Sequence, residues 1–447
     1  MKLARLTTLE KVGYGTGDTA INVVISSMFL IVAYFYTDVF GLQPTHMGIL
    51  FLVTRLIDAI TDPLMGILTD RYKSHRWGRF RPYFLYLSVP FGLSVGLMFT
   101  TPDWGYNAKL VWAYATYIFV TIMFTSVTIP YISLIGVLTS DPKERLSANG
   151  YRLFFAKIAA FCVTVIVPVL ASKWGEGDLA RGYQLAMALM AMLATGLLLF
   201  CFATTRERVE HPVETRPIKL QLALLLRNDQ WLILCAVCLT GTLGYVIRNS
   251  VAAYYATYYL NADAKMLSAF LTTGVTAAIL AMIASTWLTK YFCKVQLFRW
   301  SQVVVALLSI AMYLVVGPGD VLFAFIFYFL ISFVVDLHAP VFWSAIAEAV
   351  DYGHVKTGQR VSGLSFGGIS FFQKAGMGLA GFVVGILLSG FGYQAGAEQS
   401  DLALQGIALM LTVISGGFHL IMGLLMFKFK ITDDFYNRIK PKLPSYQ

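Results

Sequence analysis

The stretch Arg55-Leu-Ile-Asp58-Ala-Ile-Thr-Asp62 places three ionisable side chains inside an apolar run that is long enough to cross a membrane. Their spacing puts all three on one face of a helix. An ionisable side chain at the depth of the bilayer core costs at least ~2.5 kcal/mol, so it is tolerated mainly where it pairs, binds an ion or lines a solute pathway. The stretch therefore predicts a membrane helix that faces protein or water and takes part in transport.

The composition extends this prediction to the whole chain. Of its 447 residues, 57% are hydrophobic and only 13% are charged, and the mean hydropathy is +0.68. These values are too apolar for an ordinary soluble domain and indicate an all-α membrane protein with many spans. The five cysteines lie in or beside apolar segments, so they are expected to be small buried residues rather than a disulfide framework.

A hydrocarbon core about 30 Å thick needs ~20 helical residues, and this length divides the chain into twelve predicted transmembrane helices. They lie near residues 16–40, 46–69, 82–100, 108–139, 151–173, 182–204, 230–260, 264–289, 296–316, 320–350, 362–390 and 403–430. The longest polar connection, 205–229, separates a six-helix half at 1–204 from a second half at 230–447, which ends in a short cytoplasmic tail. This layout resembles the major facilitator superfamily fold, in which the solute site lies between two six-helix halves.

Basic residues are distributed very unequally between the two sides. Both termini and the loops after even-numbered spans carry 25 Lys and Arg residues, whereas the other loops carry only Lys109, Lys173, Arg181 and Lys265. The positive-inside rule then predicts that both termini are cytoplasmic, in a multi-pass protein of a bacterial inner membrane. Because topology explains the net charge of +10, no nucleic-acid partner is expected. We expect the protein to act as a monomer. Its expected partners are the lipid bilayer, a small solute and a coupling cation.

Asp58 and Asp62 form a candidate cation site. Adjacent carboxylates on one helical face can share a proton or bind a hard cation through oxygen. Thr121, Thr125 and Thr128 supply hydroxyls at helical spacing in the fourth span. The coupling ion is therefore expected to be H⁺ or Na⁺. No cofactor is expected, and the chain has no P-loop sequence for ATP.

Further polar residues inside the spans are candidates for solute binding. They are Asp18, Asn22, Arg152, Arg248, Trp343 and Lys374. Pairing within the membrane is the alternative explanation for the charged members. His338, near Asp336, is either a proton relay or, as we prefer, a satisfied core histidine. The run Gly13-Tyr-Gly15-Thr-Gly17 lacks nucleotide-loop spacing and predicts close helix packing instead.

Several strings in order along nearly the whole chain resemble the glycoside-pentoside-hexuronide:cation symporters, a family whose best-known member is melibiose permease. The strings are Gly13-Tyr-Gly-Thr-Gly-Asp18, Tyr36-Thr-Asp38, Arg55-Leu-Ile-Asp-Ala-Ile-Thr-Asp62-Pro63, Trp77-Gly-Arg-Phe-Arg-Pro82, Ile129-Pro-Tyr131, Asp141-Pro-Lys-Glu-Arg145, Asp351-Tyr-Gly353 and Lys356-Thr-Gly-Gln-Arg360. The resemblance implies a secondary active sugar importer that works by cation symport and alternating access.

The resemblance also assigns roles to individual residues. It implies a coupling-cation site at Asp58 and Asp62 with Ser370 as a further ligand, and it puts Arg152 and Lys374 near the sugar and cation sites. Asn22 stands where melibiose permease has a sugar-binding aspartate, and Thr128 replaces an acidic residue of its fourth helix. Since a lost carboxylate weakens a sodium site more than a proton site, we expect proton coupling.

The substrate is expected to be a pentoside or xyloside-like glycoside, judged by Pro340-Val-Phe-Trp343-Ser and by Arg248. Two alternatives stay open. Arg248 could hold the carboxylate of a hexuronide, or the protein could be a multidrug or lipid-type carrier that uses its charges only as a gate. An enzyme has the least support, because no nucleophile–base pair or metal cluster stands out in the sequence. The expected gating residues are Asp70, Arg71, Arg145, Asp351 and Arg360.

Overall fold

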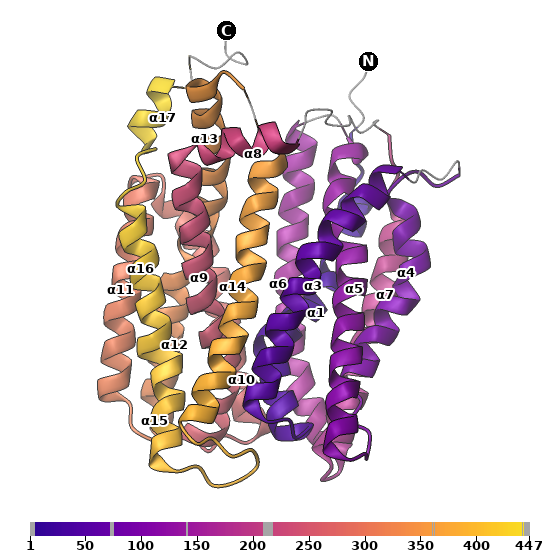
Figure 1. Ribbon diagram of the computed structural model, residues 1–447, viewed down its shortest axis with the longest axis vertical. Coiled ribbons are helices and arrows are strands. Elements are labelled where there is room, and N and C mark those ends of the chain that lie inside the picture. Colours follow the sequence, from indigo (N-terminus) through magenta and orange to yellow (C-terminus); the bar gives the residue numbers. More distant parts are fainter. Residues whose placement is uncertain are drawn as a thin grey trace. The chain divides into compact units, whose positions relative to one another are not determined.

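The computed structural model describes residues 5–71, 76–139, 142–208, 218–359, 361, 363–439 and 441. Within this part of the chain the regular elements are all helices (Figure 1). The chain divides into two compact units. The N-terminal unit comprises Met1–Val213 with Ala262–Thr272, and the C-terminal unit comprises Glu214–Asn261 with Thr273–Gln447.

The helices of the first part of the chain form most of the N-terminal unit. They are α1 (Thr8–Leu30), α2 (Val32–Tyr34), the π-helical segment η1 (Phe35–Val39), α3 (Pro44–Arg71), α4 (Arg81–Met98), α5 (Tyr106–Leu138), α6 (Pro142–Gly175) and α7 (Leu179–Thr204). Helix α1 begins with a capping box, in which Thr7 and Glu10 satisfy each other's backbone N–H groups. Helix α7 is capped at its N-terminus by Asp178, whose carboxylate accepts from two backbone N–H groups.

Alternate glycines on α1 let three other helices approach it. A Cβ atom on Gly13 would lie 1.8 Å from Thr204 of α7, one on Gly15 would lie 2.6 Å from Phe155 of α6, and one on Gly17 would lie 2.7 Å from Tyr131 of α5. No side chain larger than hydrogen fits these positions without movement of the neighbours. The predicted role of this run in close helix packing is confirmed.

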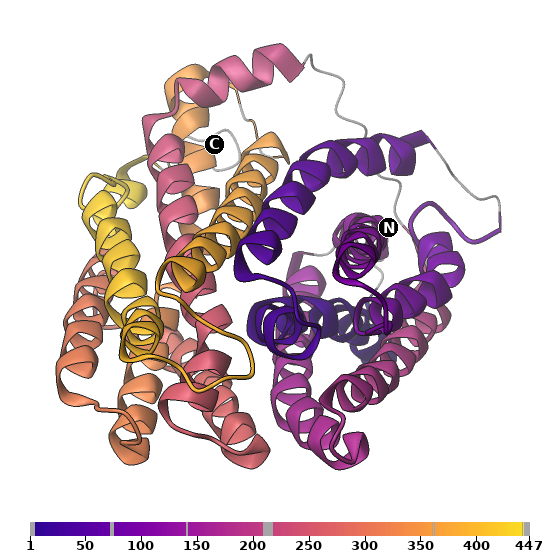
Figure 2. The ribbon, with the colours of Figure 1, turned by 60° about the horizontal axis from the view of Figure 1, so that its bottom comes forward.

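The remaining helices lie in the second part of the chain. They are α8 (Ile218–Leu226), α9 (Asp229–Tyr254), the π-helical segment η2 (Tyr255–Tyr259), α10 (Ala264–Leu288), α11 (Lys294–Val315), α12 (Val321–Asp336), α13 (Ala339–Thr357), α14 (Gly363–Gly390), α15 (Asp401–Leu409), the π-helical segment η3 (Met410–Ile414), α16 (Ser415–Met426) and α17 (Asp433–Ile439). Within the C-terminal unit, α8 runs across the ends of the long helices next to it (Figures 1 and 2).

Nine helical segments of the described residues are long and apolar enough to cross a membrane, and the bent pair Thr8–Leu30 and Val32–Val39 makes ten. Helices α12 and α13 count among them as one span. The other two predicted spans are present as α3, whose apolar stretch contains Arg55, Asp58 and Asp62, and α4, which is only 18 residues long. The all-helical membrane fold expected from the sequence is confirmed.

Candidate functional site

The acids of α3 lie beside a buried arginine. Nη1 of Arg55 is 2.5 Å from Oδ2 of Asp58, one helical turn away. Both residues are buried, with 9% of Arg55 and 0% of Asp58 exposed. A buried acid of this kind is stable as an ion only with a partner, and the guanidinium supplies a charged hydrogen bond. The opening stretch of the sequence therefore folds into a neutralised pair followed by a second acid, Asp62.

Thr125 of α5 bridges the two acids. Its hydroxyl Oγ1 lies 2.8 Å from Oδ1 of Asp62 and 3.4 Å from Oδ1 of Asp58. A hydroxyl has one proton, so it donates to only one carboxylate at a time. The shorter distance indicates that the hydroxyl donates to Asp62. The two acids of α3 therefore contact α5, the helix that carries the predicted hydroxyl ligands.

Two further threonines of α5 carry hydroxyls without partners. Thr121 and Thr128 flank Thr125 on the same helix, and within the described residues neither Oγ1 atom makes a hydrogen bond. Thr121 is 1% exposed. Membrane-helix threonines usually bond to their own backbone, so two buried hydroxyls without such a bond are oxygen atoms available to an ion or a water molecule.

A second charge pair of the N-terminal unit joins α1 to α6. Nε of Arg152 lies 3.4 Å from Oδ2 of Asp18, and the Arg152 side chain is 29% exposed. Its Nε makes no well-aligned hydrogen bond to the described residues. One turn along α1, the Asn22 amide donates to the Asp18 carbonyl at 2.8 Å. Asp18 can therefore hold the Arg152 guanidinium in place, while other N–H groups of the guanidinium remain to donate to the hydroxyls of a solute.

An aromatic pair lies next to this arginine. The rings of Tyr14 and Tyr131 stack with centroids 4.9 Å apart and planes 15° apart. The guanidinium carbon of Arg152 is 5.8 Å from the Tyr131 ring centroid. The Tyr131 hydroxyl donates to the Tyr14 carbonyl at 2.6 Å, which fixes both rings. Both tyrosines are fully buried, so they support Arg152 and do not form an open stacking surface.

Arg248 lies on α9 in the C-terminal unit. It is 2% exposed, and neither Nε nor Nη1 has a hydrogen-bond partner among the described residues. Asp336, at the end of α12, acts electrostatically on the same two tyrosines as Arg248, namely Tyr245 and Tyr328. No Arg248–Asp336 ion pair within 4.0 Å occurs in the described part of the chain. Buried guanidinium N–H groups are costly to leave unpaired, so this position suits water or an anionic group.

The other predicted solute and cation residues of the C-terminal unit differ in exposure. Trp343 on α13 is 48% exposed. Ser370 on α14 is exposed, and Lys374, one turn further, is half-buried. Their relation to the N-terminal unit stays a prediction. His338 donates from Nδ1 to the Val335 carbonyl, which agrees with the preferred interpretation of a satisfied histidine.

Of the predicted gating residues, Asp351 is the one whose side chain is described. It is 7% exposed, and Oδ2 accepts a hydrogen bond from the Tyr436 hydroxyl of α17 at 2.7 Å. Arg360 lies outside the described residues, and so do the side chains of Asp70, Arg71 and Arg145.

Sequence reasoning missed a polar pair between α11 and α16. Nδ1 of His419 lies 3.0 Å from Oε1 of Gln302, and the residues are 1% and 0% exposed. The Gln302 amide donates to the Ser301 hydroxyl at 3.0 Å, so its oxygen faces His419. The signal was a glutamine and a histidine inside apolar spans. Neither residue carries a fixed charge, so the charge pattern of the spans does not point to this pair.

Residues 13–433 match the family described as MFS/sugar transport protein. The chain is 36% identical over 414 residues to the Inner membrane symporter YicJ of Escherichia coli (strain K12), covering 93% of this chain and 89% of that protein. It is 34% identical over 412 residues to the Isoprimeverose transporter of Lactiplantibacillus pentosus, covering 90% of this chain and 84% of that protein.

The fold is also similar to a solved structure, that of a bacterial homolog of the human lysosomal transporter Spinster in an inward-facing and unoccupied conformation. The TM-score is 0.68 at 13% identity, over 95% of this chain and 99% of that chain. At this identity the likeness concerns the fold alone. Family, relatives and fold together identify a multi-pass membrane transporter and not an enzyme.

Proposed function

The chain belongs to the MFS/sugar transport protein family, and on that premise we propose that it imports a glycoside across the bacterial inner membrane by symport with a cation. Transport proceeds by alternating access of two six-helix halves, in a monomer with both termini in the cytoplasm. The observation that carries the proposal is the Thr125 hydroxyl shared between Asp58 and Asp62. It joins two acids that are able to bind and release one positive charge.

The proposed coupling ion is the proton. With both acids ionised, Arg55, Asp58 and Asp62 carry one net negative charge, which a single proton neutralises. A sodium ion instead needs several oxygen ligands at once, and the nearby threonine hydroxyls are weaker ligands than the carboxylate that Thr128 replaces. By linkage, ion binding here must strengthen solute binding as much as solute binding strengthens ion binding.

For solute binding we propose Arg152 with Asp18 and Asn22. Trp343 and Lys374 are further proposed solute-binding residues. In the Asp18–Arg152 pair the arginine side chain is 29% exposed, and stacked tyrosines lie beside it. Its N–H groups can therefore donate to several sugar hydroxyls. A pentoside or xyloside-like substrate is favoured by the strings noted in the sequence. It is also favoured by the relative named as a transporter of isoprimeverose.

A second candidate substrate class is an acidic glycoside. Arg248 favours it, because its buried Nε and Nη1 are free to hold a carboxylate. Gating by Asp70, Arg71, Arg145, Asp351 and Arg360 is proposed for either substrate.

The test is uptake by proteoliposomes of the purified protein, with neutral pentosides, hexosides and uronides offered in turn. Each is offered under an inward proton gradient, an inward sodium gradient, or neither. We expect accumulation of a neutral glycoside driven by the proton gradient and alkalinisation outside when sugar is added. Uptake that never exceeds equilibrium under either gradient would reject symport and favour a facilitator. Export of an amphipathic dye without sugar uptake would favour the multidrug carrier.

A further inference from the structure

Helix α8 exposes several leucine side chains although it lies outside the membrane spans. It is nine residues long, Ile218–Leu226, and directly precedes the membrane span α9. Leu220, Leu222 and Leu226 are 44%, 47% and 57% exposed. In contrast, Leu225 is 3% exposed and packs into the apolar core of the C-terminal unit.

The exposed side chains of α8 include a short apolar row with a basic residue at each end of the helix. Residues four apart lie one above the other on a helix. Leu222 and Leu226 make this apolar row. Lys219 in the first turn and Arg227, which directly follows the helix, are both exposed. Within the described residues neither cation makes an ion pair. Leucines flanked by cations are typical of helices that lie in a membrane interface.

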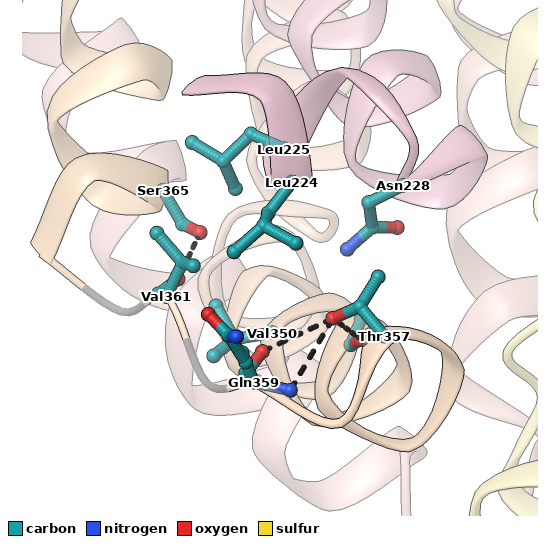
Figure 3. Close-up of a pocket in the computed structure, with 9 residues that line it drawn as sticks. Leu224, Leu225, Asn228, Val350, Thr357, Gln359, Val361 and Ser365 are labelled. Atoms are coloured by element: carbon teal, nitrogen blue, oxygen red, sulfur yellow. Dashed lines mark hydrogen bonds between the residues drawn. The ribbon is translucent and has the colours of Figure 1, made fainter. Parts of the chain in front are cut away.

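The inner side of α8 packs incompletely against its neighbours in the C-terminal unit. Leu224 and Leu225 line a small, partly open hollow, together with Asn228 before α9, residues of α13 and the connection after it, and Ser365 of α14 (Figure 3). Polar groups around the hollow already have partners. The Ser365 hydroxyl donates to the Val361 carbonyl, and the Asn228 amide donates to the Ala349 carbonyl. The hollow therefore offers little to a polar ligand, and the side chains that α8 contributes to it are two leucines.

The geometry points to the bilayer surface as the partner of the outer face. Helix α8 lies across the ends of α9, α13 and α14 (Figures 1 and 2), and its last residue is followed within three positions by the start of span α9. We propose that α8 is an interfacial helix, with Leu222 and Leu226 inserted at the edge of the acyl chains and Lys219 and Arg227 bound to anionic phospholipid headgroups. This inference goes beyond the transport activity and does not depend on the identity of the sugar.

The charges are needed because the apolar row is short. Two leucines alone bury little surface, so the docked population depends on attraction to anionic lipid. That attraction amounts to about fivefold in binding for each basic residue near the surface. Lipid bound to α8 then stabilises the neighbouring ends of α9, α13 and α14. These helices carry Arg248, Trp343 and Lys374.

The test measures how fast Leu222→Cys reacts with a bulky water-soluble maleimide in nanodiscs, where both membrane faces are open. The half-buried native cysteines Cys162 and Cys293 are replaced by serine. One set of discs contains phosphatidylcholine alone, and the other also contains phosphatidylglycerol. We expect the reaction to be at least about tenfold slower in the anionic discs. Adding Lys219→Gln and Arg227→Gln is expected to restore the fast rate.

The matched control removes two other exposed lysines from the C-terminal unit, Lys428→Gln and Lys430→Gln. It is expected to leave the lipid dependence unchanged. Equal rates in both kinds of disc, whether fast or slow, would overturn the proposal. Slow reaction in both would mean that protein, such as a second copy or another segment of this chain, covers the leucines. If the control pair removed the lipid dependence as fully as Lys219→Gln with Arg227→Gln does, the dependence would come from general surface charge. That outcome would also overturn the proposal.

Discussion

In the N-terminal unit, Arg55 and Arg152 each lie against an aspartate, whereas Arg248 in the C-terminal unit has buried N–H groups without a partner among the described residues. The difference separates two uses of a buried cation. A paired arginine sets the charge and position of an acid, and it stays in place when a proton comes or goes. An unpaired arginine is stable only if something else enters to satisfy it.

The largest effect is expected from Asp62→Asn in the N-terminal unit. The asparagine keeps the shape and can still bond to Thr125, but it cannot take up a coupling proton. Accumulation should fall to equilibration, an internal-to-external sugar ratio of about one, while sugar exchange persists. Uptake in proteoliposomes under an inward proton gradient measures this. Asp103→Asn, an exposed aspartate, is the control. Full accumulation by the Asp62 variant would show that the acid is not the coupling site.

The next largest effect is expected from Arg55→Gln, because it leaves Asp58 buried without its cation. Breaking such a pair on one side costs about 3–5 kcal/mol, so the purified protein should unfold at a clearly lower temperature. The double variant Arg55→Gln with Asp58→Asn should recover most of that loss. Exposed Arg181→Gln should change the stability by less than about 0.5 kcal/mol. A double variant no more stable than Arg55→Gln alone would mean that Arg55 acts through other contacts.

The sequence alone predicted the spans well because membrane helices follow directly from hydrophobic length. It also placed α3 correctly despite Arg55, Asp58 and Asp62 in its apolar stretch, since their spacing puts them on one helix face. It did not predict the π-helical segments η1 and η2 or the break at Leu337 and His338. These features depend on packing against other helices, and that information is spread over residues far apart in the chain.

For the site, the sequence brought Asp58, Asp62 and Thr125 together as one candidate group, and the structure places them in contact. The spacing of Arg55 and Asp58 allowed an ion pair, but which acid the guanidinium contacts depends on rotamers. The sequence also could not show that Nε and Nη1 of Arg248 lack a hydrogen-bond partner among the described residues. Spacing along a helix says which residues share a face, but not which atoms remain unsatisfied.

In the C-terminal unit, Arg248→Leu is expected to act on substrate choice. A hydrogen bond to a charged group is worth about 1.5–3 kcal/mol, so an acidic glycoside should bind at least about tenfold more weakly, while a neutral one changes little. Thermal shift with paired neutral and acidic sugars measures this. Lys265→Leu, an exposed cation, is the control. Equal losses for both sugars would reject carboxylate recognition and leave Arg248 with a structural role.

The smallest expected effect separates the two possible coupling ions. Thr125→Val removes the hydroxyl that donates to Asp62, so the acid loses a hydrogen bond and its contact with α5. Proton-driven uptake in proteoliposomes should therefore be weaker than in the unaltered protein. Thr128→Val removes a hydroxyl that has no hydrogen-bond partner in the described part of the chain, so proton-driven uptake should be unchanged. If sodium is the ion, Thr128→Val should instead weaken sodium-driven uptake as much as Thr125→Val does, because a metal ion needs both oxygens.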